Sequence, residues 1–141
     1  MTITNTRPFS AASFYQYIAE GKLMASRCAS CDALYLPPRA ICPGCQTDVL
    51  EWTELSGNGK LAAFTSIYIA PTFMIKQGFG RDKPYLTGIV ALQEGPMISS
   101  RILGLDATHP QAHWIGMPMV IEFQKRGEGE QEVTEMTFRI K

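Results

Sequence analysis

The sequence has no excess of either charge sign, because 13 Lys and Arg residues stand against 13 Asp and Glu residues among 141. Proteins that bind nucleic acids by neutralising many phosphates usually carry a basic excess, so this balance argues against that class. The sequence also lacks the run of about 18–20 apolar residues that a membrane-spanning helix needs. Its polar start, residues 1–9, lacks the charged-then-apolar pattern of a signal sequence. We therefore expect a cytoplasmic protein with no membrane partner.

Cysteine is scarce, and its four residues form two Cys-x-x-Cys pairs, Cys28/Cys31 and Cys42/Cys45. In a reducing compartment such clustering indicates a metal site before disulfides. Each pair can form a tight turn whose thiolates converge, and two turns supply the four ligands of a tetrahedral zinc ion. A redox dithiol of the thioredoxin type would place a single pair before a helix, which neither pair shows. We predict a Zn²⁺ cofactor in a closed, structural site, because four protein ligands leave no position for a substrate.

The region before the cysteines predicts one amphipathic helix over residues 10–22. Ser10 or Ser13 can cap its start, and Gly21 suits its end. Three apolar side chains share one face of this helix: Phe14, Tyr17 and Ile18. A single helix cannot bury its own stripe, so the stripe must pack on this chain or on another subunit.

The region after the cysteines predicts only β-structure. Five strands are expected, at 61–70, 85–93, 97–105, 119–124 and 132–140. Gly95-Pro96 and Gly127-Glu128-Gly129 are expected to form hairpin turns, and the insertion 106–118 a short helical turn. Five strands with an insertion between the third and fourth match the plan of an OB-fold barrel, and the pattern alone fits another small barrel equally well. The predicted fold is therefore mainly β, with an N-terminal helical segment (1–22), a zinc ribbon (23–55) and a five-stranded OB-fold domain (56–141).

A series of short motifs runs through essentially the whole chain. It comprises Glu20-Gly21-Lys22-Leu23, Arg27-Cys28, Pro37-Pro38-Arg39, Cys42-Pro43, Gly57-x-Gly59, Pro84-Tyr85, Leu92-Gln93-Glu94-Gly95-Pro96 and Ile115-Gly116-Met117-Pro118. In this order the motifs resemble a bacterial and archaeal family of rubredoxin-like zinc ribbons fused to an OB-fold. That family is described as acyl-CoA-associated and was formerly grouped as a domain of unknown function. The resemblance implies a helix, a zinc ribbon and an OB barrel, in that order.

The same resemblance implies a working context. Members of the family resemble non-catalytic partners of thiolase-like enzymes, in acetoacetyl-CoA thiolase and hydroxymethylglutaryl-CoA synthase assemblies and in steroid side-chain aldolases. The implied function is a zinc-binding accessory or scaffold protein without catalytic activity of its own, which bridges subunits or shapes the CoA channel of a thiolase-superfamily partner. Two alternatives stay open: a single-stranded nucleic-acid-binding OB-fold protein, and an obligate subunit of an acyl-CoA hydratase or aldolase complex. A homo-oligomer is compatible with each of them.

Two sets of residues are candidates for binding beyond the metal. An anionic ligand such as the phosphates of CoA needs converging cations, and the candidates are Lys22, Arg27, Arg39, Arg81 and Lys83. Partner contacts are expected from the helix and from the loop 71–84, because neither is needed to close a five-stranded barrel and exposed apolar patches mark interaction surfaces. The candidates for these contacts are Phe14, Tyr17, Phe73 and Phe79.

Two further groups of side chains are expected to be ordinary surface. His109 and His113 have a spacing that could suit a metal on a helix, but Pro110 lies between them and would break that helix. The acidic residues near the last hairpin are expected to be solvated carboxylates: Glu128, Glu130, Glu132 and Glu135.

Overall fold

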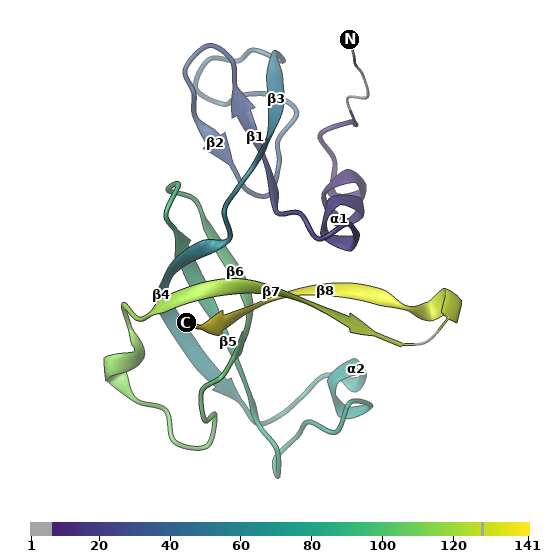
Figure 1. Ribbon diagram of the computed structural model, residues 1–141, viewed down its shortest axis with the longest axis vertical. Coiled ribbons are helices and arrows are strands. Elements are labelled where there is room, and N and C mark those ends of the chain that lie inside the picture. The colour runs from purple at the N-terminus through teal and green to yellow at the C-terminus, as the bar shows by residue number, and fades with distance from the viewer. Residues whose placement is uncertain (1–6, 128) are drawn as a thin grey trace.

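The computed structural model describes residues 7–127 and 129–141 (Figure 1). A short helix is followed by a three-stranded sheet and then by a closed five-stranded barrel. In Figure 1 the three-stranded sheet lies above the barrel, and the helix lies beside both. Within the described ranges, no helix has the length and apolar character to cross a membrane.

The elements follow one another in this order: α1 (Ala11–Ala19), β1 (Met24–Cys28), β2 (Leu34–Tyr35), β3 (Leu50–Glu54), β4 (Asn58–Ile67), α2 (Thr72–Ile75), β5 (Tyr85–Leu92), β6 (Met97–Leu103), the 3₁₀ turn η1 (Ala112–Trp114), β7 (Pro118–Arg126), the 3₁₀ turn η2 (Gly129–Gln131) and β8 (Val133–Ile140). The five strands predicted for the barrel are all present as β4 to β8, and η1 is the helical turn expected within 106–118. Glu128, in the predicted last hairpin turn, lies outside the described residues.

Helix α1 begins and ends where its local sequence directs. The Ser10 side chain accepts a hydrogen bond from the backbone N–H of Ser13 at 3.2 Å, which satisfies a donor that the first helical turn leaves free. At the other end Gly21 adopts a φ of +79°, and the N–H of Lys22 donates to the carbonyl of Tyr17 at 2.9 Å. This is a Schellman ending, which favours glycine because a left-handed backbone strains residues with a Cβ.

The three-stranded sheet has the order β2-β1-β3, with both neighbours antiparallel to β1. The sequence predicted a hairpin between the cysteine pairs but no strands at 24–28 and 50–54. These two segments lie more than twenty residues apart along the chain and pair with each other over five residues. Short strands of mixed composition give no clear alternation, so only the long-range pairing reveals them.

The barrel closes in the order β4-β5-β6-β8-β7, with β7 pairing back onto β4. All neighbours are antiparallel except β6 and β8. This is the topology of an OB-fold, which confirms the predicted fold class. The entry into β4 requires glycine at position 57, because Gly57 has a φ of +82° and a Cβ there would collide with the side chain of Ile121.

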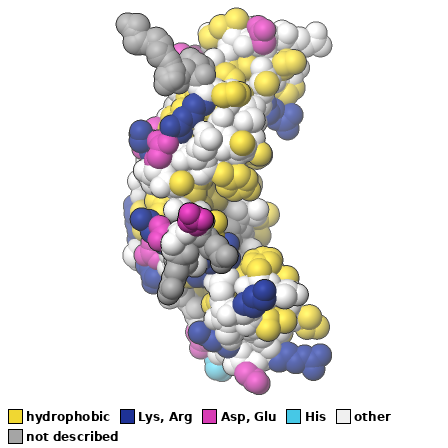
Figure 2. Space-filling view, turned by 90° about the vertical axis from the view of Figure 1, so that its right-hand side faces the viewer, with side chains coloured by type: hydrophobic (Ala, Val, Ile, Leu, Met, Phe, Trp, Pro, Cys, Tyr) yellow, Lys and Arg dark blue, Asp and Glu magenta, His cyan; other side chains and the backbone are white. Residues whose placement is uncertain are grey.

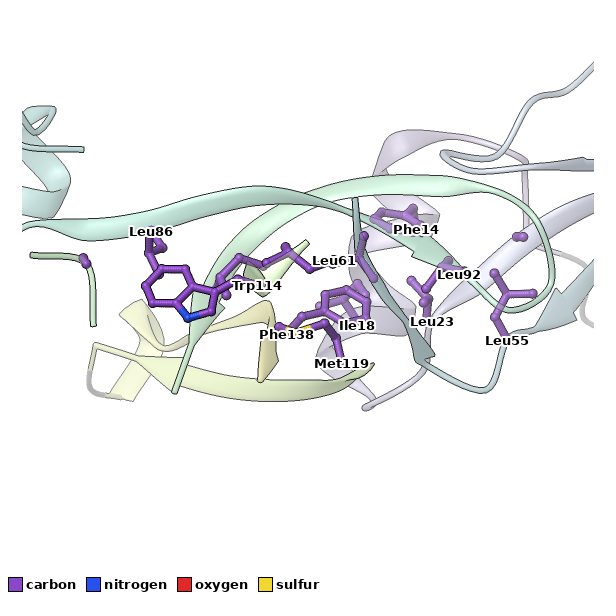
Figure 3. Close-up of a cluster of buried hydrophobic side chains, with 14 residues drawn as sticks. Phe14, Ile18, Leu23, Leu55, Leu61, Leu86, Leu92, Trp114, Met119 and Phe138 are labelled. Carbon is purple, nitrogen blue, oxygen red and sulfur yellow. The ribbon is translucent and has the colours of Figure 1, made fainter. Parts of the chain in front are cut away.

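One continuous apolar core joins the helix, the base of the ribbon and the barrel (Figure 3). The barrel contributes fully buried side chains such as Phe138 and Met119. Phe14 and Ile18 of α1 pack into the same cluster, as does Leu55 at the end of the ribbon. Burial of each large apolar side chain stabilises the fold by about 1.5–3 kcal/mol. The apolar stripe of α1 is therefore covered by this chain.

Candidate metal centre and interaction surface

The two Cys-x-x-Cys turns have the same backbone geometry. The carbonyl of Cys28 accepts from the N–H of Asp32 at 2.9 Å, and the carbonyl of Cys42 accepts from the N–H of Gln46 at 2.7 Å. Asp32 and Gln46 both adopt left-handed backbone angles, with φ of 61° and 58°. Each turn therefore reverses the chain directly after its second cysteine, so that both sulfurs of a pair point to the same side.

The four sulfur atoms lie within 4.8 Å of one another. The Sγ atoms of Cys31 and Cys42 are 3.8 Å apart. A tetrahedron with zinc–sulfur bonds of about 2.3 Å has sulfur–sulfur edges of about 3.8 Å. The four thiolates therefore fit a zinc ion. Cys28 and Cys42 are buried, whereas Cys31 and Cys45 are exposed.

The electrostatics of the four thiols also favour a cation. The hydroxyl of Tyr35, 3.2 Å from the sulfur of Cys42, and the backbone N–H of Cys45 lower the pKa of Cys42 to about 6. The same hydrogen bond raises the pKa of Tyr35 to about 12, so the phenol keeps its proton at neutral pH. By contrast, the hydrogen bond to the adjacent Cys31 thiol raises the pKa of Cys45 to about 12. Four thiolates this close repel one another, and a divalent cation removes that repulsion.

The prediction of a zinc cofactor is confirmed, because the ribbon holds four cysteines in position to bind a metal ion. With four protein ligands, zinc supplies structure, because it has no open position at which to activate water or polarise a substrate. Its role here is to hold the two Cys-x-x-Cys turns together.

The two helix residues that were candidates for partner contact, Phe14 and Tyr17, pack largely against other residues of this chain. Phe14 is only 7% exposed and lies in the shared core. Tyr17 packs edge-on against Trp52, with ring centroids 5.0 Å apart, and the guanidinium of Arg7 lies 4.2 Å from the centroid of its ring. The ring that α1 leaves exposed is that of Tyr15. The physical reason is that the ribbon and barrel both border this helix and cover its stripe.

The loop candidates lie on a mixed apolar and basic surface around α2. We call this surface the α2 patch, and its exposed apolar and basic members are Tyr68, Ile69, Phe73, Ile75, Lys76, Arg81 and Lys83. One exposed carboxylate, Asp82, lies between the last two cations. Phe73 and Ile75 are each 58% exposed, while Met74 between them is buried and anchors the short helix. Phe79 is half-buried against Tyr85, with ring centroids 5.4 Å apart. Figure 2 shows hydrophobic and basic side chains side by side in the lower part of this face.

Two arginines that the sequence did not single out support this patch from the barrel. The guanidinium of Arg126 lies 5.8 Å from the ring centroid of Phe73, and that of Arg101 lies 5.3 Å from the ring centroid of Phe79. Glu135 pairs with Arg126 at 3.0 Å and lies 4.0 Å from Arg101. The expectation that Glu135 is a solvated carboxylate is wrong, since its side chain is 19% exposed and lies between these cations. No local pattern could reveal this group, because β6, β7 and β8 each contribute one member.

The cationic candidates do not form one cluster. Arg81 and Lys83 lie in the segment between α2 and β5, where the Lys83 ammonium is 5.0 Å from the ring centroid of Phe79. Lys22, Arg27 and Arg39 belong to the ribbon end of the molecule, opposite α2 in Figure 1. Arg27 pairs with Glu51 across β1 and β3. Arg81 and Lys83 are therefore the two candidates that share a surface with exposed apolar side chains.

Both histidines are exposed between β6 and β7, as expected, with His109 in the loop and His113 in the turn η1. His109 Nδ1 is 3.1 Å from a carboxylate oxygen of Asp106. Hydrogen bonds from Thr108, with a smaller contribution from His109, lower the pKa of Asp106 to about 2. The hydrogen bonds within this turn account for the positions of Asp106 and His109 without a ligand.

Both parts of the chain match models of known domains. Residues 16–51 match the ChsH2 rubredoxin-like zinc ribbon domain, and residues 52–124 match the ChsH2 C-terminal OB-fold domain. The chain belongs to this family. Three of the similar proteins are named DUF35 domain-containing scaffold protein. The one from Methanocaldococcus jannaschii is 30% identical, over 84% of this chain and 80% of the relative. The one from Methanothermobacter thermautotrophicus is 34% identical, over 84% and 85%.

Other similar proteins carry names that refer to enzymes. A "Probable enoyl-CoA hydratase alpha subunit" from Thermomonospora curvata is 27% identical over 91% of this chain, but this chain spans only 36% of that protein. A chain of the solved structure "Ltp2-ChsH2(DUF35) aldolase" superposes with a TM-score of 0.73 and 26% identity, over 92% of both chains. A DUF35-family structure from Sulfolobus solfataricus has a TM-score of 0.59 at 14% identity, over 96% of this chain and 87% of that chain, which supports the fold alone.

Proposed function

We propose that this chain is a non-catalytic scaffold subunit of an acyl-CoA enzyme complex, in which the α2 patch docks on a thiolase-superfamily subunit near the mouth of its CoA channel. The likeness over 92% of both chains to a chain of the Ltp2-ChsH2(DUF35) aldolase supports an enzyme as the partner. The resemblance of the sequence motifs to thiolase partners supports the narrower choice.

The observation that carries the proposal is the composition of the α2 patch. Exposed Phe73 and Ile75 offer apolar area whose burial stabilises a complex by about 25 cal/mol per Å². Arg81 and Lys83 stand on the same segment and can meet the anionic phosphates of a CoA ester. The zinc site supports a non-catalytic role, since four thiolates complete its coordination.

A second candidate function is an obligate subunit of an acyl-CoA hydratase complex. The name of the Thermomonospora curvata relative favours it, although this chain spans 36% of that protein. The two functions differ in the fold of the partner and in the reaction of the complex, and the identity of the bound enzyme separates them.

The outer face of the barrel gives little support to the alternative function, binding of single-stranded nucleic acid. A hollow of about 320 Å³ over β4, β5 and β6 is lined by small and apolar side chains such as Thr65, Thr87 and Ile89. None of the residues lining it is charged. A groove that follows a nucleic-acid backbone needs cations along its floor.

The test is to tag the chain in its native host, purify it, identify the enzyme that accompanies it and rebuild the complex from pure components. We expect a stoichiometric complex with a thiolase-superfamily enzyme whose acyl-CoA KM changes when this chain is added. An enoyl-CoA hydratase in its place would favour the second candidate. Sub-micromolar binding of single-stranded DNA that weakens steeply with salt would overturn the proposal.

Variants of the α2 patch sharpen this test. Phe73→Ser with Ile75→Ser should weaken assembly at least tenfold without altering zinc content, because both side chains are exposed. Ile41→Ser is the matched control, since Ile41 is equally exposed on the ribbon. Arg81→Ala with Lys83→Ala should weaken binding of CoA esters by the complex more than assembly, with Lys60→Ala as the charge control. Assembly and binding that equal wild type in both double variants would exclude the α2 patch.

A further inference from the structure

Tyr35 is the one aromatic side chain that the structure places in hydrogen-bond contact with a zinc-ligand sulfur among the residues described. Its hydroxyl oxygen lies 3.2 Å from Sγ of Cys42. Its ring packs against the small cluster formed by Cys28, Cys42 and Leu50. Cys42 is 0% exposed, so water has no access to satisfy its sulfur.

We infer that Tyr35 is a positioning residue of the metal centre, whose hydroxyl donates a hydrogen bond to the zinc-bound thiolate of Cys42 and thereby slows the release of zinc. A zinc ion with four thiolates carries two net negative charges. Hydrogen bonds from outer donors spread this charge and hold the ligands in place. The backbone N–H of Cys45, at 3.4 Å from the same sulfur, is a second donor.

The surroundings of Tyr35 fix its ring at this site. Tyr35 lies on β2 directly opposite Ser26 of β1. Ser26 is fully buried and accepts a hydrogen bond from the backbone N–H of Arg39 at 2.9 Å. The guanidinium of Arg39 lies 5.7 Å from the centroid of the Tyr35 ring. The segment between the two cysteine turns is thus tied to β1 on one side and to the metal centre on the other.

The asymmetry of the four ligands follows from this arrangement. Cys42 has two donors and no solvent, whereas Cys31 and Cys45 are exposed. Cys42 therefore acts as the anchored ligand, and the exposed pair opens first when a chelator attacks. This inference does not depend on the proposed function, because it concerns the chain alone.

The experiment compares Tyr35→Phe with Tyr15→Phe in the full chain. Phenylalanine keeps the ring but removes the hydroxyl, and Tyr15 is exposed on α1, away from the cysteines in sequence. Zinc release to a chromophoric chelator should be roughly tenfold or more faster in Tyr35→Phe, as for other outer donors to metal ligands. After replacement of zinc by Co²⁺, the sulfur-to-cobalt charge-transfer bands should move to longer wavelength, because a sulfur that loses a donor holds its electrons less tightly.

Each alternative outcome has a definite meaning. Release rates and bands that match those of Tyr15→Phe would overturn the inference. Faster release with unchanged bands would also overturn it, since that result assigns the effect to ring packing instead of the hydrogen bond. The thermal unfolding midpoint of the barrel should stay the same in both variants.

Discussion

The ribbon and the barrel are stabilised by different means. The ribbon has a small buried cluster of its own, made of Cys28, Cys42 and Leu50 with Phe9 and Tyr35 against it. The barrel encloses large buried side chains from each of its strands, and Phe138 and Met119 are fully inaccessible to solvent. Ordering a chain segment costs conformational entropy that so small an apolar cluster cannot offset. The metal therefore stabilises the ribbon, as apolar burial stabilises the barrel.

The boundary between stabilisation by apolar burial and stabilisation by zinc lies inside the ribbon. Leu23 and Leu55, at its two ends, belong to the core shared with the barrel, and the N–H of Leu55 donates to the carbonyl of Leu23 at 2.8 Å. The base of the ribbon is thus part of the barrel's hydrophobic unit, while its tip depends on zinc. Four experiments can break or sharpen this division.

The largest effect is expected from Cys42→Ala, which removes the buried zinc ligand. Apparent binding free energies of structural zinc are about 10–16 kcal/mol, so loss of the metal should unfold the ribbon tip. Elemental analysis should find the zinc lost, and amides of β2 and of the Cys28 end of β1 should exchange fast while those of β5 and β8 stay protected. Ser30→Ala is the control within the first turn. Loss of protection in β5 and β8 would contradict the division.

The reverse experiment is Phe138→Ala in the barrel. Removing a fully buried phenylalanine should lower the free energy of unfolding by about 3–5 kcal/mol, through lost apolar contact and the cavity that remains. Denaturant unfolding measures the change, and zinc content of the folded protein should stay at one per chain. Val133→Ala, at an exposed position of the same strand, should change stability little. Zinc loss from the folded variant would show that the ribbon depends on the barrel core.

A smaller effect is expected at the junction between helix and ribbon. Gly21→Ala places a Cβ on a left-handed backbone, though it meets no atom within 4 Å. The backbone strain alone should reduce stability by about 1 kcal/mol, measured by urea unfolding. Gly80→Ala is the matched control, because its Cβ also meets open space but its φ lies outside the left-handed range. Equal stability of the two variants would show that α1 ends by another means.

The smallest effect concerns acid. The pKa of Asp106 is lowered to about 2, so its ionised form stabilises the barrel loop above the ordinary pKa and that contribution is lost as pH falls toward 2. Thr108→Ala should raise this pKa toward its ordinary value, which carbon NMR of the carboxyl group would detect, with Thr72→Ala as control. An unchanged carboxyl pKa of Asp106 in Thr108→Ala would contradict this assignment of the cause.

The local parts of the structure were predictable because their causes lie within a few residues. The Cys-x-x-Cys spacing, the serine cap of α1 and the glycine at its end each act over one turn of backbone. The apolar strands of the barrel also follow from their own composition. The short helix α2 was not predicted, since four residues held by one buried methionine, Met74, show no periodic pattern.

The sequence by itself determined the zinc ligands, the strand segments of the barrel and the neutral charge, because each is set by residue type and short spacing. Only the tertiary structure decided that the ribbon and barrel cover the apolar stripe of α1, that Arg126 supports Phe73, and that Tyr35 reaches the sulfur of Cys42. Those contacts depend on strand pairing and barrel closure, which bring together residues whose separation along the chain carries no information about their distance in space. For the same reason Glu135 lies between two arginines from other strands instead of in water.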